Sequence, residues 1–247
     1  MTAEYDAIAT QYDVTFQALP YRIFIEEWSV LQALGDVTGC SILELACGTG
    51  HYSRRLRQLG ATRAVGVDLS PEMISVAQIQ EETAPLGITY HVHDVATLDL
   101  GERFSVVLAV YLLHYAPDRA TLDAMAAVIS RHLTSGGRFV TYQMNPDIVA
   151  DPRYYEPYGL QITMPPTPED GQAYTFRAKL GDHWSPSLTV QYWSKETLHD
   201  ALERAGLVDI TWSRPTLNPD APVDNGPNHW QAYLDHPHCV LISARKP

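Results

Sequence analysis

The chain has 247 residues and a formal net charge of −12, and 45% of its residues are apolar. This length suits one α/β domain with a sizeable core, and no apolar run is long enough to cross a bilayer. Because a protein that wraps a nucleic-acid backbone needs a basic surface, the acidic balance disfavours nucleic-acid partners. The first residues do not resemble a signal peptide, and three cysteines form no disulfide framework. We therefore expect a cytoplasmic monomer or homodimer without a membrane partner.

Two helical segments, residues 5–12 and 21–34, open the chain and are rich in aromatic and aliphatic side chains. Short apolar runs then alternate with helical segments, which predicts an α/β fold with a mainly parallel, doubly wound sheet. The expected strands are residues 41–46, 64–67, 88–93, 104–110 and 138–142, and the expected helices are residues 51–59, a segment from residue 70, and 118–133.

This alternation stops after the fifth expected strand. Residues 145–193 are rich in proline and tyrosine and contain short alternating segments, so we expect antiparallel strands in an insertion over the site. A capped helix at 194–205 and strands at 207–212 and 239–244 follow, the last two joined by a proline-rich surface loop.

These patterns predict a single domain over residues 1–247, because the insertion is too short for a core of its own. Its expected parts are N-terminal lid helices (1–38), a cofactor-binding core (39–144), a substrate cap (145–193), and a C-terminal helix and strands that complete the sheet (194–247).

A glycine-rich loop follows the first expected strand, in the run Glu44-Leu45-Ala46-Cys47-Gly48-Thr49-Gly50. Such a loop lets the backbone approach a ligand closely, and proteins that bind NAD, FAD or S-adenosylmethionine (SAM) share it. The carboxylate of Glu44 would repel a pyrophosphate at the helix N-terminus, but it suits a ligand that carries an ammonium group and a sulfonium. Ser53 replaces the third glycine of the dinucleotide motif. The loop therefore favours SAM over a nicotinamide cofactor.

Two further acids end the next two strands. Asp68 follows Gly48 by about 20 residues and can accept hydrogen bonds from both ribose hydroxyls. Asp94 can accept one from the exocyclic amine of adenine, and the Val95 N–H is available to a ring nitrogen. Each acid alone is typical of a strand-end turn, but three acids at successive strand ends after a glycine loop indicate a nucleoside site.

These residues resemble the first motif and the strand ends of class I SAM-dependent methyltransferases, in the small-molecule branch, and the likeness covers residues 41–142. It implies a Rossmann-like seven-stranded sheet of order 3-2-1-4-5-7-6 with an antiparallel last strand, and an enzyme that converts SAM to S-adenosylhomocysteine (SAH). The resemblance also implies a cofactor site formed by Glu44, Ala46, Gly48, Asp68, Leu69, Met73, Asp94 and Val95.

The two ends of the chain extend this likeness. Tyr5 and Tyr12 resemble the N-terminal lid of small-molecule members, in which tyrosines close over the methionine end of the cofactor; the alternative is that these rings pack in the core. The overall layout and the histidine- and proline-rich tail also resemble bacterial natural-product N-methyltransferases of the toxoflavin type.

The acceptor should lie where the fourth and fifth strands end. Tyr111 and His114 follow the fourth strand beside the expected methyl group, and Tyr142 and Asn145 end the fifth. Tyr111 is expected to border the methionine end. His114 is a candidate base or acceptor-orienting donor, with a structural hydrogen bond as the alternative. We take Tyr111, His114 and Tyr142 as candidate catalytic residues and His114 and Asn145 as candidate acceptor contacts.

Two His-Trp pairs, His183-Trp184 and His229-Trp230, are further candidate substrate contacts, because aromatic and imidazole groups suit a planar substrate. Packing of loops onto the core is their alternative interpretation. The histidine pairs at residues 91/93 and 236/238 lack a convincing third ligand, so no metal is expected.

The expected function is methyl transfer from SAM to a nitrogen or oxygen atom of a small aromatic or heterocyclic metabolite. Such a displacement needs mainly alignment and the exclusion of water. Two alternatives stay open: a nicotinamide-dependent oxidoreductase and a non-catalytic SAM-binding protein.

Overall fold

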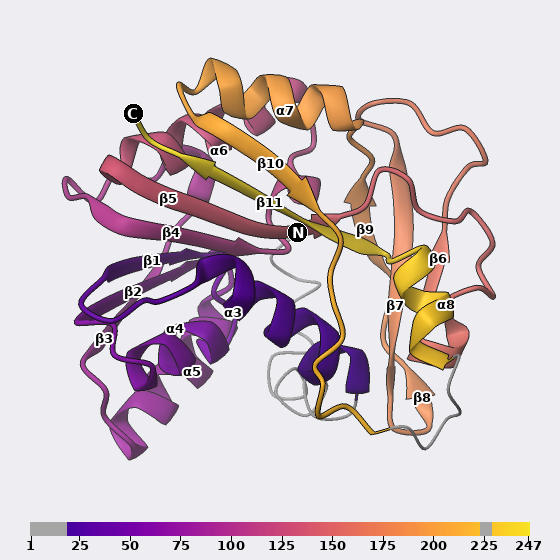
Figure 1. Cartoon of the computed structure of the whole chain (residues 1–247), viewed down its shortest axis with the longest axis horizontal. Helices are drawn as coiled ribbons and strands as arrows, with labels where there is room; N and C mark the ends of the chain where they lie inside the picture. Colours follow the sequence, from indigo (N-terminus) through magenta and orange to yellow (C-terminus); the bar gives the residue numbers. More distant parts are fainter. Residues whose placement is uncertain (1–18, 223–228) are drawn as a thin grey trace.

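A computed structural model describes residues 19–222 and 229–247. The expected helix over residues 5–12, with Tyr5 and Tyr12, lies outside these ranges. A large sheet lies between two layers of helices, and a small antiparallel sheet stands beside it with the helix α8 (His229–Asp235) (Figure 1). No helix in the described part of the chain has the length and apolar character to span a membrane.

The large sheet has seven strands in the order β10-β11-β5-β4-β1-β2-β3. β11 runs antiparallel to both of its neighbours, and the other pairs are parallel. The predicted strand order and the antiparallel last strand are therefore confirmed. The strands are β1 (Ser41–Leu45), β2 (Arg63–Asp68), β3 (Ile88–Val92), β4 (Phe104–Val110), β5 (Leu133–Met144), β10 (Val208–Ser213) and β11 (Cys239–Arg245).

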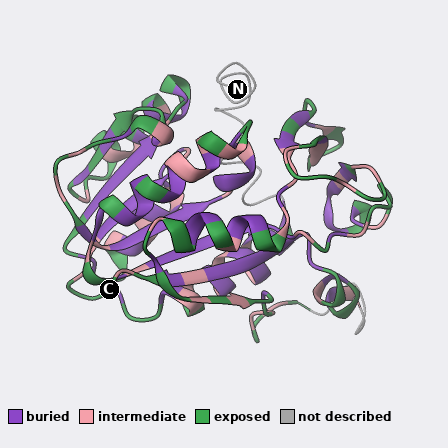
Figure 2. Ribbon diagram, turned by 90° about the horizontal axis from the view of Figure 1, so that it is seen from above, coloured by how far each residue is buried: buried purple, intermediate pink, exposed green. Residues whose placement is uncertain are grey.

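Helices cover both faces of this sheet because the central strands are apolar on both sides. One face packs against α3 (Trp28–Leu34), α4 (His51–Gln58) and α5 (Pro71–Thr83), and the other against α6 (Arg119–Arg131) and α7 (Lys195–Arg204) (Figure 1). The central strands are buried and the outer helix faces are exposed (Figure 2). On β1, Ile42 belongs to the first core cluster and Leu43 to the second, so the strand alternates between two cores.

The 145–193 insertion contains four short strands, three of them at its alternating segments and the fourth, β8, not expected. β7 (Ala173–Leu180) pairs antiparallel with β6 (Leu160–Thr163), β8 (His183–Trp184) and β9 (Leu188–Gln191). A short 3-10 helix, η4 (Glu156–Tyr158), precedes β6, and β9 packs against η3 (Leu113–Tyr115), the turn that follows β4. The insertion thus reaches the carboxyl end of the large sheet.

Three segments differ from the expected elements. The helix expected over residues 21–34 divides into a π-helix, η1 (Arg22–Glu27), and α3. The strand expected from Arg138 begins at Leu133, because Leu133 already pairs with Phe104 and the glycine turn is absorbed as a register shift. The tail is not all loop: α8 (His229–Asp235) forms within it, with Trp230 and Tyr233 buried.

Candidate functional site

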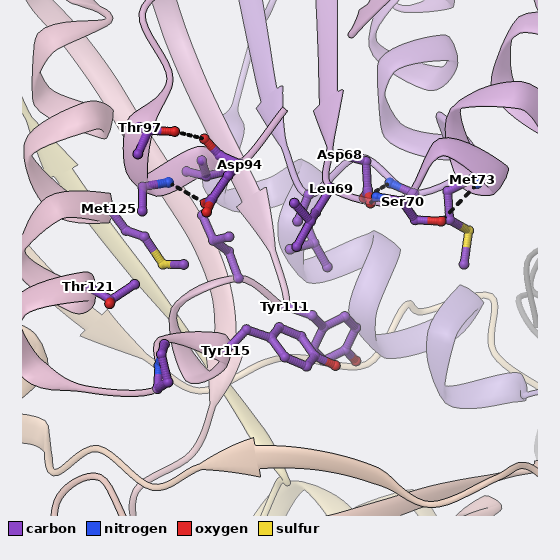
Figure 3. Close-up of a pocket in the computed structure, with 17 residues that line it drawn as sticks. Asp68, Leu69, Ser70, Met73, Asp94, Thr97, Tyr111, Tyr115, Thr121 and Met125 are labelled. Atoms are coloured by element: carbon purple, nitrogen blue, oxygen red, sulfur yellow. Dashed lines mark hydrogen bonds between the residues drawn. The ribbon is translucent and has the colours of Figure 1, made fainter. Parts of the chain in front are cut away.

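A cavity of about 410 Å³ opens at the carboxyl ends of β1, β2, β3 and β4 (Figure 3). In an open parallel sheet this edge is the usual ligand site. The structure brings together most of the residues expected at the cofactor, and those lining the cavity are Ala46, Gly48, Asp68, Leu69, Met73, Asp94, Val95 and Tyr111.

Asp68 connects the glycine loop to the helix that follows β2. One carboxylate oxygen accepts a hydrogen bond from the Gly48 N–H at 2.8 Å, and the other accepts one from the Ser70 N–H at 2.9 Å. Ser70 in turn caps α5, since its hydroxyl oxygen accepts the Met73 N–H at 3.2 Å. These bonds fix the carboxylate at the wall of the cavity.

Asp94 lies at the opposite end of the same cavity (Figure 3). Its carboxylate accepts the Ala96 N–H at 2.9 Å and opens the short 3-10 helix η2 (Val95–Thr97). Leu69 lies between the two acids in this view, and Val95 and Met125 add apolar wall. The cavity is therefore an apolar slot with a carboxylate toward each end.

Backbone strain is concentrated at this cavity. Three non-glycine residues of the described ranges have positive φ, and two of them line it: Ala46 at 56° and Tyr111 at 62°. Such a conformation costs a non-glycine residue about 1–3 kcal/mol and persists where the surroundings enforce it. Ala46 follows β1 and Tyr111 follows β4, so the chain bends sharply at the carboxyl end of each of these two neighbouring parallel strands.

Glu44 lies behind the glycine loop and not in the cavity. It is 2% exposed, and its Oε2 atom accepts hydrogen bonds from the Ser53 N–H, at 2.7 Å, and from the Ser53 hydroxyl. Burial raises the pKa of this carboxyl group to about 8. The structure therefore places Glu44 as a link between β1 and the first turn of α4.

Tyr90 of β3 explains why the loop contains glycine at its last position. A Cβ atom at Gly50, where φ is 85°, would lie 2.3 Å from the Tyr90 hydroxyl. A Cβ atom at Gly66 of β2 would lie 2.7 Å from the same ring. The tyrosine thus fills the space beneath the loop that side chains would need.

His114 and Tyr142 lie behind the cavity wall and do not line it. His114 is 2% exposed, its Nδ1 atom is 3.4 Å from the Gln143 side-chain oxygen, and burial lowers its pKa to about 3. The fully buried ring of Tyr142 packs edge-to-face against Tyr111, with 5.7 Å between ring centroids. Among the candidate catalytic residues, only Tyr111 reaches the cavity.

The candidate substrate contacts lie apart from one another. Asn145 donates a hydrogen bond to the Pro237 carbonyl oxygen at 2.8 Å. His183 and Trp184 form β8 of the small sheet. His229 and Trp230 begin α8, where they border a separate cavity of about 260 Å³. The structure therefore does not join these residues to the cofactor cavity.

Sequence reasoning missed part of the lining. Thr121 and Met125 lie one turn apart on α6 and face the cavity, and Thr97 follows Asp94 (Figure 3). For Thr121 and Met125 the sequence indicates a helix but does not specify which of its faces lies toward the cavity. The other lining residues without a predicted role are Ser70, Ala96, Val110, Leu112, Tyr115 and Pro117.

A buried polar group behind Tyr111 was also missed, and we call it the Glu26 cluster: Arg22, Glu26, Tyr52, Tyr111 and His238. Glu26 is 0% exposed and lies 3.1 Å from the Arg22 guanidinium, and the Tyr111 hydroxyl donates to it at 2.6 Å. An acid in an N-terminal helix normally indicates a solvated face, so the sequence contains no signal for this burial.

Comparison with known proteins agrees with this geometry. Residues 42–137 match the methyltransferase domain family. A ubiquinone biosynthesis O-methyltransferase of Rhodopseudomonas palustris (strain BisB18) is 28% identical over 182 residues, which cover 72% of this chain and 65% of that protein. The aligned part thus spans slightly less than two thirds of the relative's length.

Solved structures share the fold. A SAM-dependent methyltransferase from Mesorhizobium loti has 25% identity and a TM-score of 0.62, covering 89% of this chain and 97% of its own. A SAM-dependent methyltransferase from Clostridium acetobutylicum ATCC 824 has 15% identity and a TM-score of 0.61, covering 90% of this chain and 89% of its own. The predicted class I SAM-dependent methyltransferase fold and a methyltransferase domain over residues 42–137 are confirmed, and the comparisons support an enzyme with SAM as its cofactor.

Proposed function

We propose that this chain, which carries a class I SAM-dependent methyltransferase domain, transfers the SAM methyl group to a nitrogen or oxygen atom of a small aromatic or heterocyclic metabolite. The observation that carries the proposal is the apolar slot with Asp68 and Asp94 toward its two ends. A nucleoside has the matching chemistry, with ribose hydroxyls to donate at one end and an exocyclic amine at the other.

The proposed cofactor contacts follow from that match. Asp68 accepts hydrogen bonds from the ribose, Asp94 accepts one from adenine, and Leu69, Val95 and Met125 enclose the purine. Ala46, Gly48 and Tyr111 also line the cavity, and we assign methionine and the sulfonium to this part of the lining, which we call the Tyr111 end. The bound cofactor supplies an electrophilic methyl group.

Methyl transfer in this proposal depends on alignment and on the exclusion of water. His114 is an unfavourable general base, because it is buried behind the cavity wall and its lowered pKa, about 3, makes it a weak proton acceptor. The acceptor then loses its proton to solvent or to another basic group of the same acceptor molecule. A neutral amine or heterocyclic nitrogen can be methylated in this way without a general base from the protein. An oxygen acceptor can be methylated in the same way when its hydroxyl is acidic.

The acceptor class is supported by chemistry around the site and by relatives. The name of the Rhodopseudomonas relative specifies O-methylation in ubiquinone biosynthesis. The acidic net charge, −12, disfavours a nucleic-acid acceptor. We further propose that residues 1–247 form one domain with residues 145–193 as the substrate cap, acting as a cytoplasmic monomer or homodimer.

Mass spectrometry tests this function directly. The protein is incubated with SAM and a panel of heterocycles, amines and phenols, and SAH and methylated products are followed, with the Asp68→Ala variant as the inactive control. Product from one chemical class supports the proposal and identifies the acceptor atom. Tight SAM binding without turnover across the panel favours a binding protein, and binding of NAD or NADP in place of SAM favours an oxidoreductase.

A further inference from the structure

The π-helix η1 carries a buried ion pair that the proposed cofactor contacts do not use. The Arg22 guanidinium lies 3.1 Å from Glu26, and the Glu26 side chain is 0% exposed. Short π-helical segments are rare and frequently lie at functional sites. A buried ion pair is often no more stabilising than apolar packing of the same volume. Both features suggest that η1 does more than fill the core.

The Glu26 carboxylate also binds two tyrosine hydroxyls. Tyr52 donates to Oε1 at 3.1 Å, and Tyr111 donates to Oε2 at 2.6 Å. The shorter distance is typical of a charge-assisted hydrogen bond. Tyr52 lies on α4 inside the core, whereas Tyr111 lines the cavity. One carboxylate therefore fixes one cavity residue and one core residue by the same kind of bond.

Tyr111 is held on several sides in a strained conformation. Its φ is 62°, and its N–H donates to the Tyr142 carbonyl oxygen at 3.0 Å. Its hydroxyl also lies 3.4 Å from the Nε2 atom of His238, whose other ring nitrogen is 2.6 Å from the Tyr233 hydroxyl. Burial lowers the pKa of His238 to about 3, so this ring is neutral. Among the described residues, Glu26 provides the one carboxylate that accepts a hydrogen bond from the Tyr111 hydroxyl.

We propose that Glu26 is a positioning residue for methyl transfer, which holds the Tyr111 hydroxyl and thereby keeps the Tyr111 ring at the Tyr111 end of the cavity. This rests on the proposed function, which assigns the sulfonium to that end. An aromatic ring close to a cation attracts it, whereas the product SAH has no positive charge on sulfur. A fixed ring therefore favours binding of SAM over SAH, and a loosened ring loses that preference.

Two matched tyrosine variants test the proposal without disturbing the ion pair. Tyr111→Phe and Tyr52→Phe each remove one hydroxyl bonded to Glu26 and keep the ring. Calorimetry measures the dissociation constants of SAM and SAH for both variants and the wild type. We expect Tyr111→Phe to weaken SAM binding about five- to tenfold relative to SAH, and Tyr52→Phe to leave the ratio within about twofold of wild type.

Glu26→Gln gives a second measurement, with Glu27→Gln as its control. Glu27 is the next residue of η1, and its carboxylate bonds the Arg55 and His51 side chains instead. A folded Glu26→Gln protein, checked by circular dichroism, should shift the SAM/SAH ratio as Tyr111→Phe does, while Glu27→Gln should not. If Glu26→Gln does not fold, the tyrosine pair decides alone.

The possible results separate this proposal from the proposed function. A Tyr111→Phe ratio that is unchanged, or that moves no more than that of Tyr52→Phe, means that Glu26 is only structural and overturns the inference. A wild-type protein that binds neither SAM nor SAH overturns the proposed function itself, and that result needs no variant.

Discussion

The cofactor cavity and the Glu26 cluster adjoin each other at Tyr111, yet they are built in opposite ways. The cavity takes its residues mainly from successive strand ends, with Met73 of α5 and Thr121 and Met125 of α6, and its polar contacts are mostly short-range bonds to the backbone. The Glu26 cluster takes side chains from η1, α4, the end of β4 and the approach to β11, and they bond to one another. The cavity is therefore arranged to meet a ligand, whereas the cluster's side chains bond to one another.

This difference determines what a substitution should cost. A change at the cavity removes a contact with the ligand and leaves the fold largely intact. A change in the cluster leaves a buried charge or hydroxyl without its partner, which destabilises the folded protein. The following predictions test this separation of binding from stability.

The largest effect is expected for Glu26→Gln on stability. Removal of one partner of a buried ion pair typically costs about 3–5 kcal/mol, and Arg22 would be left beside a neutral amide. Urea unfolding of Glu26→Gln and Glu27→Gln measures the difference, since Glu27 forms partly exposed pairs worth about 1 kcal/mol or less. If both variants lost the same free energy of unfolding, the buried Glu26 cluster would be no more important for stability than the partly exposed pairs of Glu27.

A pH-dependent effect should follow from Glu44, the buried acid behind the glycine loop. Its pKa in the folded state, about 8, lies above the ordinary value of 4.5. Below pH 4.5 both the folded and the unfolded chain are protonated, but between these values only the unfolded chain loses its proton. The free energy of unfolding should therefore fall by about 3 kcal/mol between pH 5 and pH 8 through this residue.

Urea unfolding at several pH values checks this, because Glu44→Gln should lose that part of the slope. Glu27→Gln is the control: partial burial raises the Glu27 pKa, but the neighbouring His51 and Arg55 groups lower it by more, so its carboxyl titrates below the window. An unchanged slope in Glu44→Gln would mean that Glu44 is ionised in the folded protein.

Asp68→Ala should mainly affect binding. Loss of a carboxylate that accepts hydrogen bonds from ribose should weaken SAM about 100-fold or more. Asp99→Ala is the matched control, because the Asp99 carboxylate accepts the N–H two residues ahead, from Gly101, at 2.9 Å, as Asp68 does from Ser70. Wild-type affinity in Asp68→Ala, measured by calorimetry, would remove the basis of the cofactor assignment.

The smallest difference is expected between two glycine substitutions. Gly50→Ala meets both a positive φ of 85° and the Tyr90 hydroxyl, and should cost about 2–3 kcal/mol. Gly101→Ala meets a positive φ of 66° with no atom within 4 Å, and should cost about 1 kcal/mol. Thermal unfolding compares them; similar melting temperatures would show that Tyr90 moves aside easily.

The same contrast explains what could be predicted from the sequence. The strands themselves and the acids at their ends, Asp68 and Asp94, follow from apolar runs and the glycine loop, because these signals are local, whereas the strand order comes from the resemblance to class I methyltransferases. Glu44 was expected in the cavity, but alternation along β1 directs its side chain beneath α4, toward Ser53. Chain position and charge alone do not specify which face of a strand a side chain occupies.

The cluster could not be predicted because its contacts depend on how distant segments pack. His238 was considered only beside His236 as a metal pair, yet it contacts Tyr111, which lies 127 residues earlier. The acceptor contacts depend equally on packing, and no local pattern distinguishes a histidine on α8 from one on β8. Tertiary placement must be known before such residues can be grouped.

The strand order also has a consequence during biosynthesis. Met144 ends β5 and lies beside Cys239 of β11, 95 residues later in the chain. The strands that form the cofactor cavity and the small sheet are synthesised before β11 emerges from the ribosome. Until then, the edge of β5 that pairs with β11 stays unpaired. Unpaired edges recruit strands from other chains. A translation product that stops before residue 239 would therefore contain every residue of the cofactor cavity and still be expected to aggregate.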